Sequence, residues 1–143
     1  MFIGIYYHTL EAKGRLAIPA SFRRNLDKGS VVTRGLDGCL FLFPARDWRK
    51  FVKKLQQSPL TQKKAREFVR LMTHQAAEVE FDSQGRTRIP SYLQELAGLK
   101  KEVVIAGSLD RIEIWDKARY HRYMRKIEER SEEIAESLTE LGI

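Results

Sequence analysis

The stretch EAKGRLAIPASFRR, residues 11–24, has a second copy in DSQGRTRIPSYLQEL, residues 82–96. Both copies place an acidic residue four positions before an arginine, a glycine directly before that arginine, and Ile-Pro shortly after it. Self-similarity at a fixed spacing is the signature of a structural repeat. The sequence therefore predicts that one supersecondary unit occurs twice within 143 residues.

The similarity continues well beyond the motif. An offset of 71 residues aligns the two motifs, and after one inserted residue an offset of 72 aligns LFLF, residues 40–43, with IEIW, residues 112–115. About fifty residues bury too little surface for a good core, so we expect the two units to share one. The expected organisation is a first repeat at 1–57, a connecting helix at 58–75, a second repeat at 76–127 and an acidic helix end at 128–143.

The pattern within each unit predicts an α+β fold. A strand leads into the motif, a short strand follows it, and Ile-Pro opens a short helix, because proline fits the first helical turn. Two further strands and an amphipathic helix close each unit. We expect two half-barrels that interlock about a pseudo-twofold axis, with the helices outside.

Charge points to a polyanionic partner. The formal net charge is +7, although residues 128–143 hold six glutamates and only one arginine. A basic body of this kind attracts nucleic acid, whereas ordinary solubility is the alternative. No apolar run approaches the roughly 20 residues that span a bilayer, and a single cysteine agrees with a reducing compartment. We therefore expect a cytoplasmic protein with no membrane partner.

The two copies differ in charge, which favours the first as the nucleic-acid face. Residues 8–34 hold six basic and two acidic residues, whereas residues 78–105 hold four basic and five acidic ones. Where the first copy has Arg23 and Arg24, the second has Gln94 and Glu95. The second copy then completes the fold or contacts another subunit.

The motif residues have two open interpretations. Gly14 and Gly85 suit turns that need a positive φ. Glu11 and Asp82 each precede an arginine by four positions, which suggests a structural clamp between carboxylate and guanidinium. An arginine held in this way also presents charge to a phosphate or a guanine edge, so clamp and contact both stay open.

Catalysis has little support in the sequence. His8, His74 and His121 are scattered, and Cys39 lies in an apolar strand as a small buried hydrophobe. No phosphate-binding glycine loop is present in the sequence. We expect no enzyme activity, no catalytic or metal site, no cofactor and no small-molecule substrate.

The C-terminal helix runs from basic residues at 119–126 to acidic residues at 128–140. Its apolar stripe exceeds what a small barrel needs, so we expect it to dock on a neighbouring subunit. The basic residues of the middle helices are interpreted as a solvated face rather than as part of the nucleic-acid surface.

EAKGRLAIPASFRRNL, residues 11–26, resembles the looped-hinge element of the AbrB/SpoVT DNA-binding domains. Two such units, together with GLDGCLFLFP at residues 35–44, resemble the MraZ family of bacterial regulators. The resemblance implies a double-split, swapped-hairpin β-barrel with flanking amphipathic helices, assembled into ring-shaped homo-oligomers. It also implies a nucleoid-associated transcriptional regulator of the division and cell-wall gene cluster. Such a regulator binds double-stranded DNA at short direct repeats in its own promoter.

On this resemblance Arg15 is the expected DNA contact, and the candidate DNA-binding residues are Lys13, Arg15, Arg23, Arg24 and Arg86. The first motif has Glu11 where the family pattern has aspartate, which lengthens the clamp by one methylene. The alternative function is an antitoxin-type module that binds a protein partner. AbrB-like units also occur in antitoxins, and the acidic end of the chain agrees with such a role.

Overall fold

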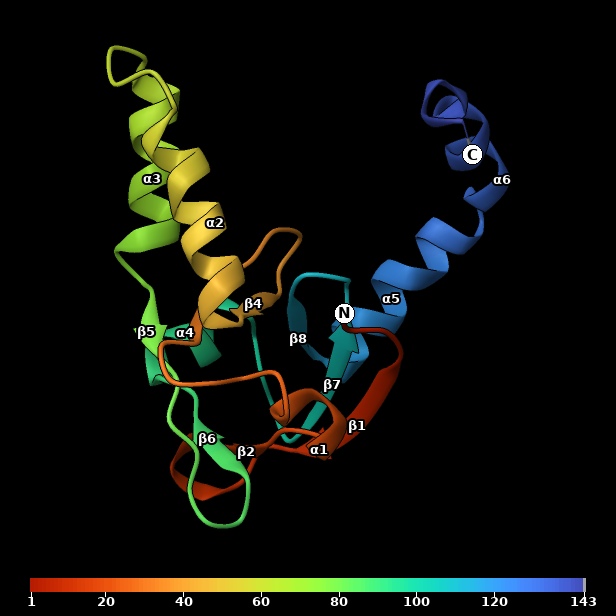
Figure 1. The fold of residues 1–143 in the computed structure, drawn as a ribbon. Coiled ribbons are helices and arrows are strands. Elements are labelled where there is room, and N and C mark those ends of the chain that lie inside the picture. Colours follow the sequence, from red (N-terminus) through yellow and green to blue (C-terminus); the bar gives the residue numbers. More distant parts are fainter. Residues whose placement is uncertain (143) are drawn as a thin grey trace.

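The computed structural model describes residues 1–142, which form an α+β fold with six α-helices and eight strands (Figure 1). The strands are β1 (Ile5–Thr9), β2 (Arg15–Ala17), β3 (Val31–Arg34), β4 (Leu40–Phe43), β5 (Ala77–Glu78), β6 (Arg86–Arg88), β7 (Glu102–Gly107) and β8 (Ile112–Asp116). The helices are α1 (Ala20–Arg23), α2 (Ala45–Gln56), α3 (Lys63–Thr73), α4 (Ser91–Leu96), α5 (Lys117–Glu128) and α6 (Ser131–Ser137). Two 3₁₀ turns, η1 (Ala12–Gly14) and η2 (Thr139–Leu141), complete the list.

The elements repeat in the order that the sequence predicts. The offset of 72 residues carries α2 onto α5 and β4 onto the start of β8, and the offset of 71 carries β2 onto β6. Short helices α1 and α4 follow Ile-Pro as expected, but Pro19 and Pro90 each lie just before the helix rather than inside its first turn.

The strands of the two repeats are exchanged. A six-stranded sheet has the order β1-β7-β8-β4-β3-β5, so the first strand of each repeat pairs with the third strand of the other. The remaining strand pairs between the repeats join equivalent strands, β4 with β8 and β2 with β6, and every strand pair is antiparallel. Leu16 lies opposite its own equivalent, Thr87, and Phe41 lies opposite Glu113. This register places a pseudo-twofold axis between the repeats, and neither repeat completes its sheet alone.

The expected swapped-hairpin β-barrel is not confirmed, and no closed barrel occurs in residues 1–142. The six-stranded sheet is open, with β1 and β5 at its edges, and β2 and β6 form a separate two-stranded ribbon. Strand β2 contacts β1, and an isolated bridge joins Phe81, after β5, to Thr87 of β6, but no ladder of strand pairs closes the sheet into a barrel in the described residues.

Both repeats share one core, as their length predicts. The main cluster includes both motif isoleucines, Ile18 and Ile89, together with Leu16, Leu93 and Val103, each at most 1% exposed. A second cluster packs α2 and α5 on the sheet through aromatic residues such as Phe43 and Trp115. The apolar stripes of the two closing helices therefore cover the sheet.

Two helical arms extend away from the ribbon (Figure 1). Helices α2 and α3 form one arm, and α5 and α6 form the other, while the β2–β6 ribbon lies at the opposite end of the molecule. The acidic end does not continue α5 as one helix: α5 ends at Glu128, and α6 begins after Arg130, whose φ is −118°. None of the helices in residues 1–142 is long and apolar enough to cross a membrane.

Candidate nucleic-acid interface

The outer face of the β2–β6 ribbon carries three arginines. Leu16 and Thr87 at its centre are buried, at 0% and 2% exposure. Because side chains alternate along a strand, the flanking positions lie on the opposite, outward face. These positions are Arg15 and Ala17 on β2, and Arg86 and Arg88 on β6. The two motif arginines thus share one surface, which is built from both repeats.

Arg86 is held by two carboxylates. Its Nε donates to Asp82 Oδ2 at 2.9 Å, and its Nη1 donates to Glu11 Oε1 of the other repeat at 3.1 Å. Asp82 Oδ1 also accepts the backbone N–H groups of Gln84 and Arg86, at 2.9 and 3.0 Å. The backbone bond from Arg86 is the main cause that lowers the pKa of Asp82, and the bond with Asp82 raises the pKa of Arg86. The positive charge of Arg86 is therefore balanced by carboxylates within the protein.

Arg15 has a different environment. Glu11 was expected to pair with Arg15 in its own motif, but the structure places the Glu11 carboxylate on Arg86. Within residues 1–142 the Arg15 side chain makes no ion pair or hydrogen bond, and it is half-buried on the ribbon. Of the two equivalent motif arginines, Arg15 is therefore the one whose charge remains available.

Arg23 makes a structural hydrogen bond in the first repeat and contacts the second repeat. Its Nη1 donates to the carbonyl oxygen of Ile18 at 2.6 Å, and its guanidinium lies against Gly85 of the other repeat. Gln94, the residue equivalent to Arg23, donates in the same way to the carbonyl of Ile89, at 2.7 Å. The charge on Arg23 is thus not needed for this structural bond, because an uncharged side chain makes the same bond in the second repeat.

The remaining predicted residues lie around the ribbon. Gly14 and Gly85 have φ values of +73° and +76°, which confirms the expectation of positive φ. Lys13 also has a positive φ, +64°, and its side chain is exposed. Arg24 is exposed at the end of α1. The structure therefore places Arg15 and Arg86 on one ribbon face and Lys13 in the turn directly before β2, while Arg23 and Arg24 lie at the adjoining helix.

Other candidate chemistry lies apart from the ribbon. Cys39 is buried, its Sγ donates to the carbonyl of Leu36 at 3.3 Å, and burial raises the pKa of its thiol. Among the residues that the structure describes, no three His, Cys, Asp or Glu side chains lie where they could together hold a metal ion.

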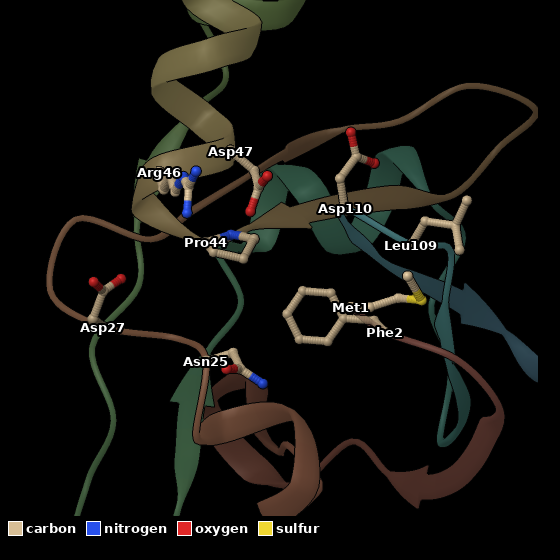
Figure 2. A pocket seen from close by; sticks show the side chains of 9 residues that line it. All are labelled: Met1, Phe2, Asn25, Asp27, Pro44, Arg46, Asp47, Leu109 and Asp110. Atoms are coloured by element: carbon tan, nitrogen blue, oxygen red, sulfur yellow. The ribbon is translucent and has the colours of Figure 1, made fainter.

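A cavity of about 440 Å³ near Met1 is lined by three aspartates, Asp27, Asp47 and Asp110, and by Arg46 (Figure 2). Its carboxylates outnumber its single guanidinium, so this cavity does not suit a polyanion.

The fold and this surface define a class: a two-repeat α+β protein whose exchanged repeats present an arginine-bearing ribbon. A family described as "MraZ protein" and as antitoxin-like matches residues 1–71 and again residues 72–141. The chain is 51% identical to a protein of Halothermothrix orenii and 48% identical to one of Pediococcus pentosaceus. It is 44% identical to one of Moorella thermoacetica, and each comparison covers the full length of both chains. All three relatives are named "Transcriptional regulator MraZ". This chain belongs to the MraZ family.

Sequence reasoning missed two features of the surface. The structural bond of Arg23 was not expected, although the alignment of Arg23 with Gln94, another long hydrogen-bond donor, was a signal for it. Arg88 was counted only in the net charge, because its equivalent in the first repeat is Ala17.

Replacing Asp82 with asparagine should lower stability in a pH-dependent way. The pKa of Asp82 is lowered in the folded protein, so its ionised form contributes stability that is fully present above its unfolded pKa of 3.8. That contribution is lost as the pH falls below 3.8 through the folded pKa. Thermal melts of wild type and Asp82→Asn from pH 7 to pH 2.5 should therefore differ at neutral pH and converge in acid. A difference that persists unchanged at pH 2.5 contradicts an electrostatic clamp.

Two substitutions of Arg23 should separate charge from structure. Arg23→Ala leaves the buried Ile18 carbonyl without its partner and should cost about 1–3 kcal/mol of unfolding free energy. Arg23→Gln can keep the bond, as Gln94 does, and should stay within about 0.5 kcal/mol of wild type. Urea unfolding measures both. Equal losses in the two variants contradict the structural bond.

Proposed function

We propose that this chain is a sequence-specific, DNA-binding transcriptional regulator. The observation that carries the proposal is Arg15, a motif arginine on an outward ribbon face that lacks a carboxylate partner within residues 1–142. The major groove of B-DNA admits a two-stranded ribbon, and arginine is the commonest side chain to read a guanine edge there. The names of the MraZ relatives support the same role.

The roles of the other basic residues follow from their positions. Lys13 and Arg24 are exposed beside the ribbon and would contact phosphates, which position a protein on DNA without reading sequence. Arg23 contributes charge beyond its structural bond. Arg86 serves chiefly as the clamped partner of Glu11 and Asp82, so we assign DNA contact to Arg15 first.

The regulator is proposed to bind short direct repeats in the promoter of its own division and cell-wall gene cluster, as a ring-shaped oligomer in the nucleoid. A ring repeats one ribbon at a fixed spacing, and several weak contacts then gain from effective concentration. The exchange of β1 and β5 between repeats supports the swapped-hairpin description of each unit.

An antitoxin-type role is the second candidate, because the matching family is also described as antitoxin-like. The acidic segment at 128–142 suits a basic protein partner, and none of the residues in α6 is buried. A module of this kind would not need Arg15.

The test is fluorescence anisotropy with a labelled promoter fragment from upstream of the protein's own gene. Wild type should bind this fragment more tightly than a scrambled fragment, and its affinity should fall with salt. Arg15→Ala should lose about 1–3 kcal/mol of binding free energy per site if it reads a base edge.

Arg122→Ala, an exposed arginine on α5, is the matched control and should bind like wild type. Equal, weak binding of both fragments by wild type and by Arg15→Ala would reject the regulator and favour a protein partner.

A further inference from the structure

Arg88 lies directly opposite Arg15 in the ribbon. The backbone bonds from Ile18 N–H to the Gly85 carbonyl and from Ile89 N–H to the Gly14 carbonyl mark the hydrogen-bonded pairs of this ladder. Hydrogen-bonded and non-hydrogen-bonded pairs alternate, so Arg15 and Arg88 form a non-hydrogen-bonded pair. In such pairs the Cα atoms are about 4.5 Å apart and the side chains are at their closest.

This pairing is unfavourable for the isolated protein. Like charges directly opposite each other destabilise a pair of strands. The two carboxylates nearest in sequence, Glu11 and Asp82, are both engaged by Arg86. Within residues 1–142 neither Arg15 nor Arg88 makes an ion pair. The ribbon thus has one neutralised half around Arg86 and one half with two uncompensated positive charges.

A hollow of about 580 Å³ adjoins the uncompensated half. It is lined by Lys13, Gly14, Arg88, Ile89, Pro90, Ser91, Tyr92 and Gln94. Two cationic side chains, from different repeats, therefore border one depression, and Ser91 adds a hydroxyl. The hydroxyl of Tyr92 donates to the carbonyl of Gln75 at 3.3 Å, which fixes that wall of the hollow. No acidic residue is among those that line it.

We propose that Arg88 and Lys13 form one anion site across the two repeats, beside Arg15, and that this site binds a backbone phosphate of the DNA while Arg15 reads the base edge. This inference rests on the proposed function and adds a phosphate contact from the second repeat, which the charge comparison had expected to complete the fold or to contact another subunit. A phosphodiester bound to the Arg88 guanidinium offsets the repulsion between Arg88 and Arg15 through charge-assisted hydrogen bonds. Arg88 then contributes affinity rather than sequence preference, because a phosphate contact is the same for every base.

Three variants test the site in the full-length protein. Arg88→Gln removes the charge and should weaken binding of the promoter fragment roughly tenfold. It should weaken binding of the scrambled fragment by the same factor, and the slope of log affinity against log salt concentration should become about 1 less steep. Arg88→Glu should weaken binding further, because its carboxylate faces Arg15 and repels phosphate. Arg122→Gln, the control on α5, should leave both affinities unchanged.

Thermal melts without DNA give an independent readout. Arg88→Gln should melt at or above the wild-type temperature, and Arg88→Glu should melt higher still, because it can pair with Arg15 across the ribbon. Loss of binding together with a lower melting temperature would mean that Arg88 is structural, and would overturn the proposal.

Promoter binding by Arg88→Gln equal to that of wild type and of Arg122→Gln would overturn this inference while leaving the proposed function intact. Failure of wild type to prefer the promoter would instead reject the proposed function, and this site with it.

Discussion

The pairing of β2 with β6 is the contact on which the rest of the structure depends. It joins equivalent residues of the two repeats, buries Leu16 and Thr87 against the shared core, and leaves the motif arginines outside. The exchange of β1 and β5 follows the same pseudo-twofold axis, so each repeat supplies a strand that the other lacks. A single unit of some fifty residues would leave these strands unpaired and the core half built.

This symmetry is broken by a few side chains at the surface. On one half of the ribbon, Arg86 faces Ala17 and binds two carboxylates. On the other half, Arg15 faces Arg88 and binds neither of these carboxylates, because Glu11 pairs with Arg86 of the second repeat. The two repeats thus keep the same order of elements while their halves of the ribbon differ in charge. The repulsion between Arg15 and Arg88 lies at a solvated edge, where salt screens it and keeps it small.

Much of the fold could be predicted from the sequence, because the repeat fixes the order of elements and the hydrophobic periodicity fixes their types. The shared core could be predicted from the short length of each repeat. The positive φ of Gly14 and Gly85 could be predicted because each glycine lies in a turn between two strands. Strand partners could not be predicted, since no local pattern says that β1 pairs with β7. For the same reason the partner of Glu11 was missed, because its ion pair with Arg86 crosses between the repeats. The structural bond of Arg23 to Ile18 is local and was missed although Gln94 stands at the equivalent position. The break after Glu128 was also missed, because Glu129 and Arg130 do not oppose a helix locally.

The most direct measurement is cleavage of promoter DNA by an iron chelate tethered to a single introduced cysteine. The native Cys39 is buried, and the raised pKa of its thiol keeps it from being labelled. With the label at Ser91→Cys, beside the ribbon, we predict strand breaks within the bound promoter repeats. With the label at Thr61→Cys, at the tip of the α2–α3 arm, we predict none. Breaks from position 61 but not from position 91 would place the DNA on the helical arm and contradict a ribbon interface.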